Sequence, residues 1–217
     1  MSKLIECVPN ISEGLDLNKI NKIAKSVLNY EGVKLLNIDP GKATNRTVIT
    51  FVGPPETIID AAYSLISKAK ELIDMRLHKG EHPRMGAVDV CPFIPISGVS
   101  MKETDDLAHQ LGKRVGSELL IPVYCYENAA KNKQRVNLAN CRSGEYEGLK
   151  NKLRDVKWKP DYGPNQFNET VAKFGAIAIG ARDFLVAYNI NLNTTSTRRA
   201  NSVAFDLREA GRVKREG

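Results

Sequence analysis

Residues 77–86 (LHKGEHPRMG) gather two histidines, a glutamate, a lysine and an arginine between glycines and a proline. An imidazole titrates near neutrality, so it can accept a proton from an attacking amine and return it to a departing one. Gly80 and Pro83 disfavour a continuous helix, which predicts an irregular loop at this point. We therefore expect His82 to be an acid–base residue. The alternative is a loop histidine that only bonds a backbone carbonyl.

The same segment also matches a metal-binding pattern. His78, Glu81 and His82 have the spacing of the inverted zinc-protease motif, which needs a helix to bring both imidazoles to one face. Because Gly80 and Pro83 oppose that helix, a zinc site is not expected.

A second group of polar residues lies in a predicted hairpin. Arg46 offers a bidentate fork suited to a carboxylate, and Asp39 is a candidate to hold a cationic amidine or an N–H group. Asn45 lies beside them. The simpler interpretation is turn chemistry, which favours Asp, Pro, Gly and Asn in residues 39–45.

The elements that must position these groups follow a clear order in the first part of the chain. Apolar periodicity predicts strands over 4–8, 33–38, 47–52 and 87–96 and helices over 17–28 and 55–72. Turn signals at Pro9 and Asn10 and at residues 39–41 end the first two strands. The order β-α-β-β-α-β indicates an α+β fold of the ferredoxin-like type, an antiparallel sheet with helices on one face.

The remainder is predicted less regularly. A capping box over 100–103 begins a third helix, 122–126 is a strand, and 135–153 is helical in part. We expect a long irregular loop over 158–174. Strands over 176–179 and 184–192 and a helix over 195–210 complete the prediction. We therefore divide the chain into an N-terminal subdomain, residues 1–181, and the beginning of a second, similar subdomain, residues 182–217.

Composition restricts the class of protein. The chain has 217 residues, 42% of them hydrophobic, and 32 basic against 25 acidic side chains give a net charge of +7. The excess favours anionic partners, but the charge is scattered and no aromatic motif accompanies it, so a nucleic-acid binder ranks last. The sequence has no apolar run of roughly 20 residues and no CxxC pair among its four cysteines, so we expect a soluble cytoplasmic protein without a membrane segment or disulfide framework.

Several longer motifs carry a resemblance. The runs ECVPNISEG from Glu6, TNRT from Thr44, HKGEHPRMG from His78 and DVCPFIP from Asp89 resemble the glutamate formiminotransferase family. This family is the transferase half of formiminotransferase-cyclodeaminase. Residues 144–147, 161–164 and 180–192 continue the likeness, which spans nearly all of the chain.

The resemblance implies transfer of a formimino group from N-formimino-L-glutamate to tetrahydrofolate, giving 5-formiminotetrahydrofolate and glutamate. It implies two ferredoxin-like subdomains with a substrate tunnel between them, tetrahydrofolate as co-substrate, no metal, and a homodimer. The family's catalytic histidine corresponds to His82. Asp39 is the candidate to hold the amidinium or orient His82, and Arg46 and Arg84 are candidates for substrate carboxylates. The implied substrate- and folate-binding residues also include Asn45, Gly163, Pro164, Asn165, Gln166, Phe167 and Gly175.

Two departures from the family pattern leave alternatives open. Residues 166–174 are a few residues longer than in relatives, and the family's second subdomain begins near Arg182, so this chain would hold only its first strand and helix. The same site would serve formyl transfer between 5-formyltetrahydrofolate and glutamate in folate salvage. A non-catalytic folate-binding half that needs a partner chain is a further alternative.

Overall fold

The computed structural model describes residues 2–186, 190 and 192–208 of the chain. Contacts divide the chain into two compact units, Met1–Asp183 and Phe184–Gly217, and each is described by itself. The subdomain boundary at residues 181 and 182 stays a prediction. Among the described residues, none of the helices combines the length and the apolar character needed to cross a membrane.

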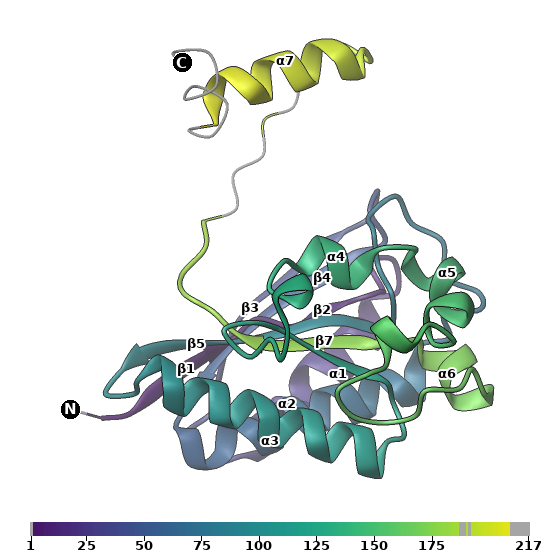
Figure 1. Ribbon diagram of the computed structural model, residues 1–217. Helices are drawn as coiled ribbons and strands as arrows, with labels where there is room; N and C mark the ends of the chain where they lie inside the picture. The colour runs from purple at the N-terminus through teal and green to yellow at the C-terminus, as the bar shows by residue number, and fades with distance from the viewer. Residues whose placement is uncertain (1, 187–189, 191, 209–217) are drawn as a thin grey trace. The chain divides into compact units, whose positions relative to one another are not determined.

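The strands of the first unit form one sheet (Figure 1). They are β1 (Leu4–Cys7), β2 (Asn10–Ile11), β3 (Lys34–Gly41), β4 (Arg46–Gly53), β5 (Val88–Ser97), β6 (Val123–Glu127) and β7 (Ile177–Ala181). β1 and β2 pair in turn with β4 on one side and β5 on the other, and β3 pairs with the far side of β4, all antiparallel. The α+β class is confirmed, and this part of the sheet is consistent with the ferredoxin-like order.

The sheet continues beyond this antiparallel part. β7 joins β5 and β6 joins β7, and both of these pairings are parallel. Parallel neighbours need crossover connections, and the helical segments between β5 and β6 and between β6 and β7 supply them. The antiparallel sheet expected from the sequence is therefore one part of a mixed sheet of seven strands among the described residues.

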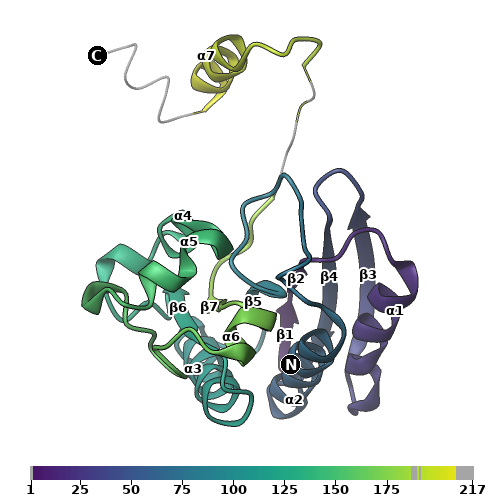
Figure 2. The same cartoon turned by 90° about the vertical axis from the view of Figure 1, so that its right-hand side faces the viewer.

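Helices cover the two faces of the sheet unequally. They are α1 (Leu17–Lys25), α2 (Pro55–Leu72), α3 (Met101–Glu118), α4 (Leu138–Arg142), α5 (Glu145–Lys152) and α6 (Glu169–Phe174), with α7 (Thr197–Leu207) in the second unit. Figure 2 shows α1, α2 and α3 along one face, as expected, and α4 and α5 on the other face beside β6 and β7. Within residues 2–183, no helix covers that second face over β3 and β4.

Side-chain alternation explains these layers. In β4 every second residue is buried, and Ile49 and Phe51 pack in one core with Ile58 and Leu65 of α2. A smaller apolar cluster on the opposite face joins the strands β5, β6 and β7 to α5, with Tyr124 at its centre. The residues of β4 between the buried ones, beginning with Arg46, are left half-exposed on the uncovered part of that face.

Local sequence signals set several helix ends where the sequence predicts them. Ser100 and Glu103 form the reciprocal capping box of α3, in which each side chain bonds the other residue's backbone N–H. Pro55 occupies the first position of α2, where its missing N–H has no cost.

Other predictions differ from the structure. β3 continues through the turn expected at 39–41, and Asn10, expected to end a strand, begins β2 instead. The loop expected over 158–174 contains α6, because the side chain of Asn168 caps the N-terminus of that helix. In the strand expected over 184–192, residues 184–186, 190 and 192 have no strand structure and the others lie outside the described residues. The helix expected over 195–210 is α7, and its expected last two residues are likewise not described.

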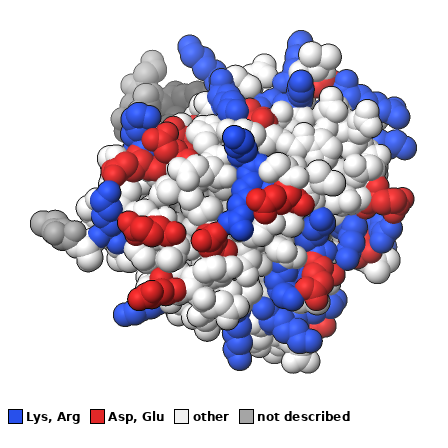
Figure 3. Space-filling view, turned by 90° about the horizontal axis from the view of Figure 1, so that it is seen from below, with Lys and Arg blue, Asp and Glu red and all other residues white. Residues whose placement is uncertain are grey.

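The net positive charge is not concentrated on the face formed by α2 and α3. Figure 3 shows basic and acidic side chains interspersed there. This distribution agrees with the scattered charge of the sequence and gives that face no continuous basic surface.

Candidate functional site

The segment between α2 and β5 is a loop held firmly at both ends. Met75 donates its backbone N–H to Lys173 O at 2.8 Å, and the backbone N–H of Ala87 bonds Phe174 O at 2.7 Å. The backbones cross closely at Gly175, which has φ +86° and would place a Cβ 2.1 Å from Met85 O. Only glycine fits such a position, so Gly175 fixes the end of the loop that carries His82.

His82 is half-buried, and both ring nitrogens have partners. Nδ1 lies 2.7 Å from Pro83 O, and because a carbonyl only accepts, Nδ1 carries the proton. Nε2 therefore has a free electron pair, and Arg46 Nη1 donates to it. Burial, and then the positive charge of Arg46, lower the pKa of His82. The imidazole is thus neutral near neutral pH, with the basic nitrogen directed at Arg46.

Arg46 is the first residue of β4 and lies on the uncovered part of the sheet. Its Nη2 donates to Asn10 Oδ1, while its buried Nε has no partner among the described residues. Burial, followed by repulsion from Arg142, lowers the pKa of this guanidinium. A cation that is partly desolvated, and has one unpaired donor, is a suitable ligand for a carboxylate.

Asn45 is brought next to the loop, with its side chain engaged by backbone atoms. Its Oδ1 accepts from Gly14 N at 2.9 Å and its Nδ2 donates to Lys79 O at 2.8 Å. The His78 ring donates from Nε2 to Asn45 O at 2.9 Å. These bonds tie the β3–β4 hairpin to the His82 loop. The predicted substrate contact of Asn45 stays a prediction.

Arg84 is buried, and every nitrogen of its guanidinium has a partner. Nη1 and Nη2 form a bidentate pair with Glu147 at 2.8 and 2.7 Å, Nη1 also bonds Glu145 at 3.1 Å, and Nε donates to His78 Nδ1 at 3.3 Å. The pKa of Arg84 is raised, chiefly by its bond to Glu147. Its predicted role with a substrate carboxylate stays a prediction, since two carboxylates already occupy the guanidinium.

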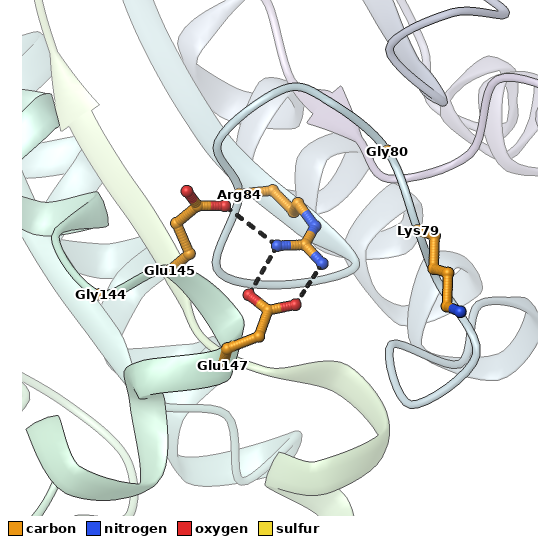
Figure 4. A pocket seen from close by; sticks show the side chains of 6 residues that line it. All are labelled: Lys79, Gly80, Arg84, Gly144, Glu145 and Glu147. Carbon is orange, nitrogen blue, oxygen red and sulfur yellow. Dashed lines mark hydrogen bonds and ion pairs between the residues drawn. The ribbon is translucent and has the colours of Figure 1, made fainter.

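These charged groups line a cavity of about 490 Å³, shown in Figure 4. In the figure Arg84 lies between the two glutamates at the start of α5, and Lys79 lies across the loop from them. A second cavity, of about 280 Å³, shares Gly144 and Glu145 with the first and is bordered by Pro83 and Arg142. The His82 loop is therefore accessible at Pro83.

Asp39 is exposed on β3, where it pairs with Val48 of β4. On the other side of β4, Val48 pairs with Asn10 of β2. Residues opposite one another share a face of the sheet, and two strand spacings separate the backbones of Asp39 and Asn10 by roughly 10 Å. Because the ring of His82 is oriented by Pro83 and Arg46, Asp39 is not its partner in this structure. Its proposed contact with an amidinium stays a prediction.

The predicted folate-binding residues separate into two places. Gly163 has φ +81° and packs so closely on the segment between α3 and β6 that a Cβ would lie 2.1 Å from Ile121 O. Pro164 follows it, and three further predicted residues line a cavity of about 230 Å³ against α5: Asn165, Gln166 and Phe167. Gly175 instead crosses the His82 loop. No hydrogen bond in the described part of the chain joins residues 163–167 to His82 or Arg46, and their contact with folate stays a prediction.

The zinc pattern is not assembled. His78 and His82 lie on a loop rather than a helix, and no group of three or more His, Cys, Asp or Glu side chains in the described ranges is arranged to hold a metal ion.

Three residues of the site were missed at the sequence level: Asn10, Asp89 and Arg142. Asn10 was assigned to a turn, and Arg142 lies 53 residues from its ion-pair partner Asp89. The one available signal was Asp89 itself, an acidic residue within an otherwise apolar strand.

Comparisons with known proteins identify the family of the chain. Residues 4–182 match the family model described as the formiminotransferase domain, N-terminal subdomain. The formimidoyltransferase-cyclodeaminases of Dictyostelium discoideum and Rattus norvegicus are 48% and 50% identical over 100% and 99% of this chain, which spans 40% and 39% of their lengths. The glutamate formimidoyltransferase of Thermoplasma acidophilum is 47% identical over 94% of this chain and 67% of its own. The chain thus spans about two fifths of the first two relatives, and it belongs to the formiminotransferase domain family.

Proposed function

We propose that this chain takes part in transferring the formimino group of N-formimino-L-glutamate to tetrahydrofolate, with His82 as the acid–base residue. The observation that carries the proposal is the neutral His82 ring, whose Nδ1 proton is held by Pro83 and whose Nε2 is directed at Arg46. Relatives named glutamate formimidoyltransferase support the reaction class.

The chemistry needs one base that later becomes an acid. N5 of tetrahydrofolate attacks the amidine carbon and forms a new C–N bond, and His82 Nε2 takes the proton that N5 loses. The tetrahedral intermediate then breaks its bond to the glutamate nitrogen, which receives the proton from the imidazolium. The products are 5-formiminotetrahydrofolate and glutamate, and no electron is exchanged with a cofactor.

Arg46 is the proposed ligand for a substrate carboxylate. A carboxylate that binds Arg46 draws the guanidinium away from Nε2, because the anion is the stronger partner. Substrate binding would then expose the basic nitrogen at the moment it is needed. Asp39, exposed on the same face of the sheet, remains the proposed partner of the positively charged amidine.

The other predictions rest on the family resemblance. We propose tetrahydrofolate as co-substrate and residues 163–167 as part of its site, near a cavity that Lys150 and Arg154 also line. Two basic side chains there suit the carboxylates of a folate tail. A cytoplasmic location is proposed from the composition of the sequence, and a homodimer on the resemblance alone.

The experiment that tests the function is product identification. The chain is incubated with formiminoglutamate and tetrahydrofolate, and in parallel with 5-formyltetrahydrofolate and glutamate, and products are identified by mass spectrometry. We expect glutamate and 5-formiminotetrahydrofolate from the first mixture. Formyl transfer in the second mixture alone would favour folate salvage. Folate binding without turnover in either would show a binding half that needs further protein.

A further inference from the structure

Asp89 is a carboxylate only 1% exposed, inside the otherwise apolar strand β5. Along the pairing with β2, Asn10 lies opposite Val90 and Ile11 opposite Val88, so Asp89 is the additional residue of a β-bulge. A bulge directs a side chain away from the regular alternation and is common beside active sites.

The two carboxylate oxygens of Asp89 hold two different parts of the site. Oδ1 accepts the backbone N–H of Met85 at 3.0 Å. Oδ2 accepts from Arg142 Nε at 2.8 Å and Nη2 at 2.5 Å. Met85 is two residues from Pro83, whose carbonyl accepts the Nδ1 proton of His82. One side chain therefore fixes the backbone that orients His82 and also fixes Arg142.

Arg142 acts on His82 through its charge. The charged groups that influence the ring are Arg46 from β4, Arg142 from α4 and Asp89 from β5. Both arginines lower the pKa of His82, and the carboxylate raises it. By holding Arg142 in a fixed place, Asp89 sets how much positive charge surrounds the basic nitrogen.

Packing alone does not explain a charge at this position. A buried ion pair pays a desolvation cost that an apolar residue in a strand would avoid. We propose that Asp89 is the positioning residue of His82: it fixes the Pro83–Met85 backbone that sets the histidine tautomer and holds Arg142 beside the ring. Its effect on catalysis rests on the proposed function, whereas its effect on His82 does not.

The chain contains a matched control. Asp161 is also a buried carboxylate that accepts one backbone N–H, from Cys125 at 2.8 Å, and pairs with one arginine, Arg135 at 2.6 Å. Among the described residues, Asp161 forms no hydrogen bond or ion pair with the His82 loop. Asp161→Asn and Asp89→Asn therefore remove the same kind of buried charge from two places.

The experiment reads His82 directly by long-range ¹H–¹⁵N NMR. The chain has three histidines, so the His82 signals are assigned by their loss in His82→Gln. Spectra are recorded over a pH titration for the wild type and for Asp89→Ser, Asp89→Asn, Arg142→Gln and Asp161→Asn. Formimino transfer is measured on the same samples, and thermal unfolding shows which variants fold.

In the wild type we expect the Nδ1–H tautomer. Asp89→Ser should convert it to a mixture of tautomers and lower kcat roughly 10- to 100-fold, by analogy with the loss when the outer partners that orient metal-binding histidines are removed. Arg142→Gln should keep the tautomer and raise the titration midpoint of His82. Asp161→Asn should leave the His82 spectra unchanged.

A folded Asp89→Ser chain with the wild-type tautomer and midpoint would overturn the proposal. If that variant does not fold, wild-type midpoints in both Asp89→Asn and Arg142→Gln would overturn it instead. If the tautomer changes in Asp89→Ser and the wild type itself transfers no formimino group, the positioning role is upheld and the proposed function is rejected.

Discussion

Replacing Arg46 by methionine tests whether this residue binds a carboxylate of the substrate. The guanidinium is half-buried, has an unpaired Nε among the described residues and lies against the basic nitrogen of His82. Hydrogen bonds to charged groups contribute about 1.5–3 kcal/mol. Because about 1.36 kcal/mol corresponds to tenfold, Arg46→Met should raise KM for formiminoglutamate roughly 10- to 150-fold.

The same substitution should also move the pH profile. Arg46 lowers the pKa of His82 by repelling the imidazolium, so its removal raises that pKa. His82 must be neutral to accept a proton, and the acidic limb of kcat/KM reports the pKa of the free enzyme. The limb should therefore shift to higher pH in Arg46→Met.

Steady-state kinetics between pH 5 and 9 measure both effects, with Arg46→Lys as the matched control. Lysine keeps the charge but loses the planar fork, so it should give an intermediate KM and an acidic limb close to that of the wild type. In Arg46→Met, a KM within about twofold of the wild type together with an unmoved acidic limb would show that Arg46 neither binds the substrate carboxylate nor lowers the pKa of His82.

Three further predictions concern stability. Gly175→Ala should destabilise the chain by at least 1–3 kcal/mol in urea unfolding, because φ is +86° and the new Cβ would meet Met85 O; an unchanged midpoint would contradict the close crossing. Lys152→Met should cost about 1–3 kcal/mol, because the ammonium bonds three carbonyls at the end of α4; equal stability would show that these bonds contribute nothing. The capping bonds from Ser100, together with the ion pair to Lys3, lower the pKa of Glu103 to about 2, so their stabilisation is complete above the ordinary pKa of a glutamate and is lost as pH falls towards 2. Acid unfolding of Glu103→Gln should lack that loss, and a wild-type acid transition would refute it.

The regular elements could be predicted because their signals are local. The alternation around Ile49 and Phe51 places β4 in the core, and the capping box at Ser100 begins α3 at the expected residue. The additional strands β6 and β7 were also expected, but not the parallel pairing of β7 with β5 and of β6 with β7. These pairings depend on the crossover connections and on the order in which distant strands meet.

The loop that carries His82 was predicted from the sequence, but the residues packed around it were not. His82 stands out because a loop concentrates ionisable side chains, and Arg46 because it begins a strand beside a turn. From the sequence, Arg84 is as suitable a ligand for a substrate carboxylate as Arg46. Its carboxylate partners, however, lie 61 and 63 residues away along the chain, and no local sequence pattern predicts these contacts. The Asp89 bulge likewise follows from register, which the sequence pattern leaves open.

The most direct test of His82 as the base compares two histidines of one chain. Initial rates of formimino transfer are measured for the wild type, His82→Ala and His109→Gln; His109 bonds Tyr162 and Asp105 rather than any group of the His82 loop. If His82 is the base, its substitution should lower kcat by about 10²–10⁴-fold and abolish the acidic limb, while His109→Gln keeps both. Transfer by His82→Ala at the wild-type rate would show that His82 is not the base.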